Sequence, residues 1–165
     1  MRLMRCLRHL TTRGWTVVRR FPPRTLQAIE AAIRESETLH RGEIRFAIEG
    51  GLDVWSVWRG ITSRDRAVQT FGDLCVWDTE ENSGVLIYVL LADHRVEILA
   101  DRGFTPSVEA GEWAEVCREM ERRFSEDQFE AAAMEGVQAV GSILARVFPL
   151  LGGNPNELPD RPVIL

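Results

Sequence analysis

The chain contains no lysine, because all 20 of its basic residues are arginine. This absence excludes the phosphate-loop lysine, the Schiff-base lysine and the protein-kinase lysine, together with the enzyme classes that need them. The glycine-rich dinucleotide motif, the metalloprotease motif and the serine nucleophile elbow are absent as well. We therefore expect no nucleotide cofactor.

Cysteines and long apolar runs are also scarce. Cys6, Cys75 and Cys117 are odd in number and widely spaced among 165 residues, so they form neither a disulfide framework nor a zinc-type pair. No window reaches the roughly 18 apolar residues of a spanning helix, and arginines interrupt the first apolar stretches, unlike a secretory signal. We expect reduced thiols in a cytoplasmic protein, peripheral to the inner membrane face.

Acidic residues are absent from residues 1–24, which carry seven arginines, whereas the remainder has 13 arginines and 25 acids. Near an anionic membrane each arginine contributes on the order of 1 kcal/mol. The residues expected to do so are Arg2, Arg5, Arg8, Arg13, Arg19 and Arg20. A solvated terminus is the alternative interpretation. Nucleic acid is not expected as a partner, since the acidic remainder repels phosphate.

The stretch from Trp77 to Gly103 is the most informative part of the chain. Residues 84–91 are a continuous apolar run, typical of a strand covered on both faces, and residues 95–100 form a second strand after a short polar turn. This pattern predicts an antiparallel hairpin in a buried sheet. Residues 43–49 alternate in polarity and predict a further strand.

Helical patterns surround these strands. A short amphipathic helix is predicted before Gly14, with Leu3, Leu7 and Leu10 on one side, and a second helix enters through Pro22 and Pro23. Thr62 and Asp65 resemble a capping box, and two more helices follow Gly103, the later one capped by Ser125 and Gln128. Residues 52–61 have no clear periodicity, so Trp55 and Trp58 either cover the sheet or anchor a partner.

The predicted fold class is therefore α/β, an α/β/α layered sandwich around a short mixed sheet that contains the antiparallel hairpin. Three segments are distinguished: a basic segment over residues 1–20, an α/β domain over 21–149, and a tail over 150–165. The tail has an apolar end after a glycine-rich linker. We expect it to dock, either on its own chain or on another.

The blocks GEIR at residues 42–45, GVLI at 84–87, RVEI at 95–98 and DRG at 101–103 resemble, in this order, the TPM domain, also called the thylakoid-lumen phosphatase-like domain. This resemblance implies the sandwich fold and loops at one sheet edge that bind a divalent cation in some members. It also implies either a weak acid phosphatase or a factor that assists the assembly of membrane protein complexes. The strand that ends in Ala-Asp-Arg-Gly replaces a glycine-rich turn of the commoner pattern.

Acidic residues enter one strand of the hairpin and leave the other, so they should be neighbours at one sheet edge. Carboxylate and amide oxygens are the ligands that Ca²⁺ and Mg²⁺ prefer. The predicted metal ligands are Asp78, Glu81, Asn82 and Asp101. Solvated turn residues, with Asp101 capping the next turn, are the alternative.

Two functions follow from these patterns. The first is a non-enzymatic TPM-like module that binds another protein at the cytoplasmic face of a membrane, with Ca²⁺ or Mg²⁺ at the acidic edge. The second is a metal-dependent acid phosphatase in which Asp78 or Asp101 orients water and Arg102, Arg64 or Arg66 neutralises charge. The chain offers no nucleophile motif and no histidine near the acidic edge, which favours the first.

Overall fold

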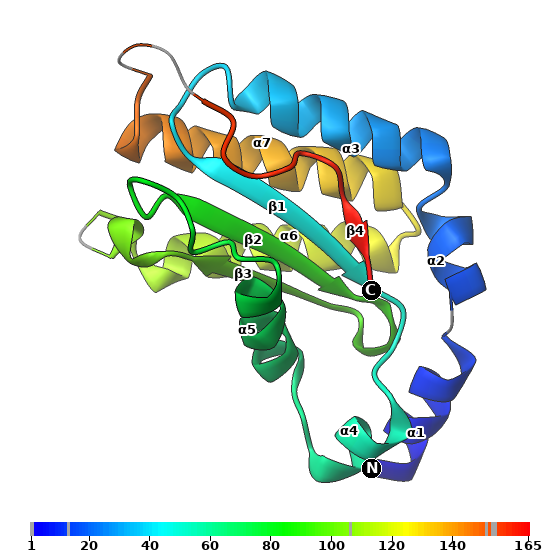
Figure 1. Ribbon diagram of the computed structural model, residues 1–165. Helices are drawn as coiled ribbons and strands as arrows, with labels where there is room; N and C mark the ends of the chain where they lie inside the picture. The colour runs from blue at the N-terminus through cyan, green and yellow to red at the C-terminus, as the bar shows by residue number, and fades with distance from the viewer. Residues whose placement is uncertain (1, 13, 106, 151, 153–154) are drawn as a thin grey trace.

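The computed structural model describes residues 2–12, 14–105, 107–150, 152 and 155–165, without the side chain of Arg2. Figure 1 shows a sheet between helices. In chain order the elements are α1 (Arg2–Thr11), α2 (Gly14–Arg20), α3 (Pro23–Ser36), β1 (Glu43–Glu49), α4 (Val54–Arg59), α5 (Ser63–Asp73), β2 (Gly84–Leu90), the 3-10 turn η1 (Leu91–Asp93), β3 (Arg95–Ala100), the 3-10 turn η2 (Arg102–Phe104), α6 (Ala110–Ser125), α7 (Phe129–Val147) and β4 (Val163–Ile164).

The sheet has the strand order β3-β2-β1-β4 and is mixed. β1 pairs with β2 in parallel, from Glu43 opposite Gly84 to Glu49 opposite Leu90. β2 pairs with β3 in antiparallel register, so the predicted hairpin is confirmed. Every residue of β1 and β2 is buried, which explains why the apolar run of β2 does not alternate.

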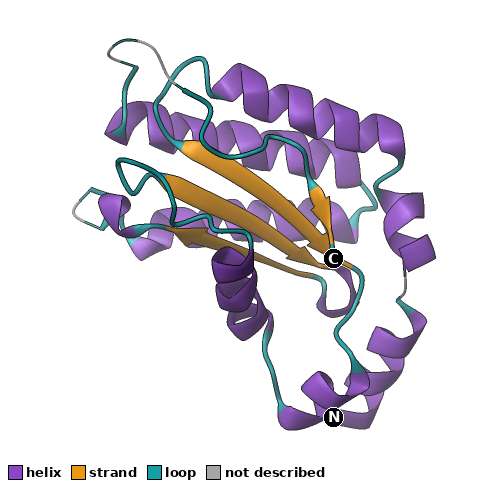
Figure 2. Cartoon of the chain, viewed as in Figure 1, coloured by secondary structure: helices purple, strands orange, loops and turns teal. Residues whose placement is uncertain are grey.

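Helices cover both faces of the sheet, although unequally (Figure 2). Ile44, Phe46 and Ile87 belong to a core formed with α3, α6 and α7. Ala47, Leu86 and other residues of the opposite face pack with α5, α4 and Cys6 of α1. The predicted α/β/α sandwich is therefore confirmed, and it has three long helices on one side and shorter ones on the other.

The C-terminal tail docks on its own chain. β4 adds in parallel to β1, with Val163 opposite Ala47 and Ile164 opposite Ile48. The buried Glu43 carboxylate accepts a hydrogen bond from the Leu158 amide at 3.1 Å. The tail therefore completes the sheet and covers the edge of β1, which would otherwise present unpaired backbone groups.

One segment for which no element was predicted forms a helix, and one predicted helix cap is wrong. Residues 54–59 form α4, a short helix without a repeating apolar pattern. Asp53 caps its N-terminus by accepting from the Ser56 amide, and Gly60 ends it in the left-handed region. Ser125 does not cap α7: it lies at the end of α6, where its hydroxyl donates to the Arg122 carbonyl at 2.5 Å. In contrast, the capping box of Thr62 and Asp65 is present at the start of α5.

Candidate functional site

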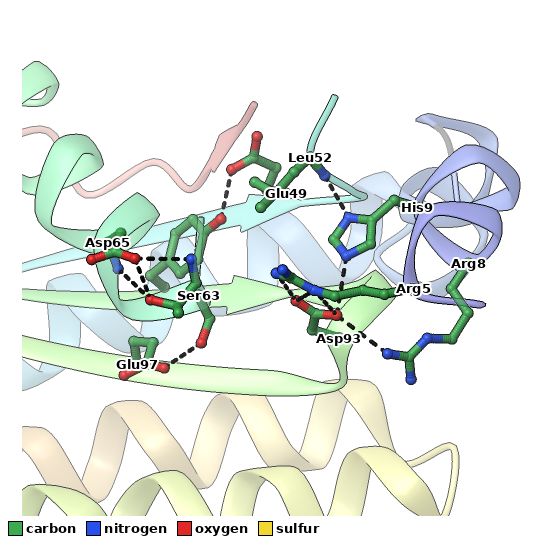
Figure 3. Close-up of polar contacts among 11 residues, drawn as sticks. Arg5, Arg8, His9, Glu49, Leu52, Ser63, Asp65, Asp93 and Glu97 are labelled. Atoms are coloured by element: carbon green, nitrogen blue, oxygen red, sulfur yellow. Dashed lines mark hydrogen bonds and ion pairs between the residues drawn. The ribbon is translucent and has the colours of Figure 1, made fainter. Parts of the chain in front are cut away.

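The N-terminal helix α1 is held on the domain by the buried Cys6 and by the polar side chains next to it. Arg5 donates to Asp93 in η1 with an Nη2–Oδ2 distance of 2.6 Å and an Nε–Oδ2 distance of 3.0 Å. Nη2 of Arg8 lies 3.4 Å from Oδ1 of the same carboxylate. Figure 3 shows these side chains converging on Asp93 from α1. One acid at the turn between β2 and β3 therefore holds the basic helix.

His9 completes this attachment. The Leu52 amide donates to its Nδ1 at 2.8 Å, so Nδ1 is unprotonated and Nε2 carries the hydrogen that is donated to Asp93 at 3.0 Å. Gly51 allows the close approach, because a Cβ atom there would lie 3.0 Å from the His9 carbonyl oxygen. Burial by itself would raise the pKa of Asp93, but the hydrogen bonds from His9 and Arg5 outweigh it and hold that pKa well below its usual range.

The opposite side of α1 is apolar and faces solvent. Leu3 and Met4 are 69% and 67% exposed, and α4, which packs beside α1 (Figure 1), exposes Trp55 and Trp58. We call this the α1–α4 surface, formed by the exposed residues Leu3, Met4, Leu7, Leu10, Val54, Trp55 and Trp58. The interpretation that the two tryptophans cover the sheet is wrong. Because α1 docks through Cys6 and polar groups, its apolar residues stay on the surface together with those of α4. This patch is larger than single, scattered apolar surface residues would form.

The basic residues of the first segment divide into two groups. Arg5 and Arg8 are engaged by Asp93, as described above. Arg19 and Arg20 of α2 form no ion pair within the described part of the chain. Arg13 and the side chain of Arg2 lie outside the described residues. Among the described arginines of this segment, those without an ion pair therefore lie on α2, next to the exposed Trp15 and Val18.

The predicted acidic edge lies at the other end of the sheet, about 20 Å away along the seven residues of β2. There the Gly103 amide donates to the Asn82 carbonyl at 3.1 Å, and Arg102 Nε donates to the Asn82 side chain at 2.8 Å. Asp101 caps η2 by accepting from the Arg102 amide at 2.7 Å. The structure therefore brings Asn82 and Asp101 into one loop cluster, as the antiparallel hairpin predicted.

Two carboxylate oxygens of this cluster are buried without a hydrogen-bond partner in the described residues, Glu81 Oε2 and Asp101 Oδ2. The other oxygen of Glu81 pairs with Arg41. An unpaired buried carboxylate oxygen costs free energy that a cation would recover. No group of three or more acidic, histidine or cysteine side chains suited to a metal occurs in the described ranges, so a bound ion would need further oxygens from Asn82, the backbone and water.

Arg64 and Arg66 of the phosphatase interpretation lie elsewhere, whereas Asp78 precedes the acidic edge in the chain. Asp78 is exposed in the preceding turn. Arg66 Nε binds Glu49 at 2.8 Å near the far end of β1, and Arg64 binds the Ile98 carbonyl at 2.8 Å. Arg102 therefore remains as the candidate cation at the acidic edge.

The imidazole of His40, the residue before Arg41, makes hydrogen bonds with the Ser36 hydroxyl at 2.9 Å and the Gly42 carbonyl at 3.0 Å. His40 is buried, and burial lowers its pKa to about 4, so it is neutral in the fold. His94 takes the left-handed conformation at the hairpin turn, with φ 53°. Cys75 is a free cysteine with an exposed side chain.

The fold is an α/β/α sandwich, with three layers, a four-stranded mixed sheet and a parallel strand pair followed by a hairpin. The model of the TPM domain matches residues 19–143. The chain belongs to the TPM domain family. Among solved structures, it resembles the NMR structure of BA42 protein from the psychrophilic bacterium Bizionia argentinensis, at a TM-score of 0.75 and 29% identity, over 86% of this chain and 93% of that one. No curated protein matches.

The comparisons therefore confirm the resemblance inferred from the four sequence blocks. Within the described residues, no helix combines the length and the hydropathy needed to cross a bilayer. Sequence reasoning missed Asp93, the residue that fixes α1. The sequence does contain the parts of this contact: an acid in a short turn, and Arg5 and His9 four residues apart on one helix face. However, more than 80 residues separate the partners, so no local pattern indicates that they pair.

Proposed function

We propose that this TPM domain is a non-enzymatic module that binds the cytoplasmic face of an anionic membrane and meets a protein partner there. The observation that carries the proposal is the inverted docking of α1, whose polar side binds Asp93 while its apolar side faces outward. Exposed aromatic and aliphatic side chains beside arginine are the composition of helices that lie in a membrane interface. Tryptophan in particular favours the headgroup region.

The free arginines support an anionic surface over a neutral one. Arg19 and Arg20 lie on α2, which follows α1 and is not engaged by acids in the described chain. Each arginine near an anionic lipid surface contributes about 1 kcal/mol to the free energy of membrane binding. The apolar residues would insert into the membrane interface, and the arginines would attract the anionic headgroups. The exposed part of the acidic remainder of the chain would stay in water.

Vesicle sedimentation tests the proposal. The Leu3→Gln/Leu7→Gln double variant should bind phosphatidylglycerol vesicles about 30-fold more weakly, since each exposed leucine contributes about 1 kcal/mol when it leaves water. The matched control is Leu39→Gln/Val68→Gln, which removes side chains of 65% and 55% exposure from other elements. Equal sedimentation of both doubles, or no sedimentation of the parent protein, would contradict the proposal.

A second function, divalent-cation binding at the acidic edge, is favoured by the two unpartnered oxygens of Glu81 and Asp101. Ca²⁺ should raise the melting temperature of the parent protein and not that of Asp101→Asn. Asp73→Asn, which removes a 63% exposed acid from the end of α5, serves as the control and should respond like the parent. No Ca²⁺ response in the parent would contradict the site.

Metal-dependent turnover of a phosphomonoester, lost with chelator and with Asp101→Asn, would instead support the phosphatase alternative. Among the arginines predicted to neutralise phosphoryl charge, Arg102 is the one at this edge, where its Nε lies 2.8 Å from the Asn82 side chain.

A further inference from the structure

A second basic feature lies where α2 meets α3 and the start of α7. A surface pocket of about 620 Å³ opens there, and its walls include Trp15, Arg19, Arg20, Arg24 and Thr25. The three arginines come from the end of α2 and the first turn of α3, so the short Phe21–Pro22 connection brings them together. None of the three forms an ion pair within the described residues.

The arrangement around these arginines suits a phosphate group. The Arg20 guanidinium lies over the Phe129 ring at 4.8 Å, which holds it at the pocket wall. The first turn of α3 lines the same pocket, and the N-terminus of this 14-residue helix has no side-chain cap, while the Thr25 amide donates to the Pro22 carbonyl at 2.9 Å. Arginine forks match the geometry of phosphate oxygens.

Two acids also line the pocket and limit its charge. The Glu130 carboxylate accepts a hydrogen bond from the buried Thr25 hydroxyl, and Asp127 is exposed at the turn before α7 with φ 58°. The three arginines outnumber these two carboxylates. The acids therefore reduce the attraction for a phosphate without reversing it, and removing one of them should strengthen binding.

We propose that this pocket binds the phosphate of a phosphomonoester or phosphodiester, either in a lipid headgroup or in a soluble molecule. Binding of a lipid headgroup would rest on the proposed membrane function. Binding of a soluble phosphate would not, because none of the residues that line the pocket belongs to the α1–α4 surface. The exposed Trp15 ring would lie against the organic part of such a ligand.

The test uses the full chain and two soluble probes, inorganic phosphate and glycerol phosphate, followed through the amide signals of Arg24 and Thr25. We expect saturable shifts that Arg19→Gln and Arg24→Gln each weaken about three- to tenfold. Asp127→Asn should strengthen binding about two- to fivefold, a change that a general loss of structure would not produce. Arg118→Gln on α6 removes the same charge elsewhere and should leave the affinity within about twofold.

The source of the phosphate is distinguished on vesicles. Because Arg19 also supplies general attraction in the proposed membrane function, competition distinguishes the two sources. Glycerol phosphate at matched ionic strength should lower the preference of the parent protein for phosphatidylglycerol over phosphatidylcholine if the ligand is a headgroup, and should leave it unchanged if the ligand is a soluble phosphate ester. Arg19→Gln/Arg24→Gln should lose soluble binding in both cases. Leu3→Gln/Leu7→Gln should leave soluble binding unchanged, which separates this pocket from the α1–α4 surface. Unchanged phosphate affinity in the arginine double variant, or an equal loss in Arg118→Gln, would overturn the proposal.

Discussion

Replacing Asp93 by asparagine should release α1 from the domain while the sheet stays folded. The substitution keeps the size of the side chain but removes the charge that Arg5, Arg8 and His9 share. On its outer side α1 exposes Leu3, Leu7 and other apolar residues to solvent, and the helix has 10 residues in all. A helix this short is marginal in water without tertiary contacts, so undocking and unfolding of α1 should coincide.

The magnitude follows from the contacts. The Arg5 and Asp93 side chains are 22% and 10% exposed, and a charge-assisted hydrogen bond in such a setting contributes about 1.5–3 kcal/mol. The contact from His9 adds about 1 kcal/mol, whereas Arg8 is 53% exposed and adds little. A loss of about 3 kcal/mol should speed amide exchange in α1 about 100-fold, provided that exchange occurs by local opening.

Hydrogen exchange read by mass spectrometry measures this directly, with peptides from α1 compared with peptides from β2. Asp73→Asn is the matched control, since Asp73 is 63% exposed and only approaches Arg66 at 3.9 Å. Because the pKa of Asp93 is lowered in the fold, its contribution is complete above the unfolded value of about 3.9 and is lost only as the pH falls through the folded value. Exchange in α1 that is unchanged in Asp93→Asn would refute this account of docking, and so would equal acceleration in β2.

Three further predictions concern stability. Burial raises the pKa of Glu43 to about 7 and that of Glu37 to about 8. The fold therefore loses stability as the pH rises from about 4.5 through these values. Glu43→Gln should raise the melting temperature at about pH 9 and have little effect at about pH 4. Gly103→Ala should destabilise the domain by about 1–3 kcal/mol in urea unfolding, because its Cβ would lie 2.5 Å from the Asn82 carbonyl oxygen. Gly111→Ala, with open space around its Cβ on α6, should instead stabilise it by about 0.5–1 kcal/mol.

The sequence predicted the elements whose signals are local. β1, β2 and β3 lie where the apolar runs placed them, and the Thr62 capping box begins α5 as expected. Within the acidic edge, antiparallel pairing alone brought Asn82 to the Asp101 loop. These features depend on residue order over short distances, and a periodic pattern contains that information.

The features that periodicity missed depend on contacts between distant segments. An amphipathic α1 was predicted, but which side it buries is decided by Asp93 and by the glycine at position 51 that admits it. The same applies to the tail, where Glu43 and the edge of β1 select docking in cis. Hydrophobic pattern assigns the apolar side to the core by default, and the polar attachment of α1 overrides that default.

The central claim is that the apolar side of α1 enters a lipid surface. Methyl NMR of the protein on phosphatidylglycerol nanodiscs that contain a lipid spin-labelled in its acyl chain measures this without any substitution. We predict strong paramagnetic broadening of the Leu3 and Leu7 methyl signals, and none for Leu39, which is 65% exposed after α3. Equal broadening of all three leucines, or sharp signals from Leu3 and Leu7 in the bound protein, would contradict the claim.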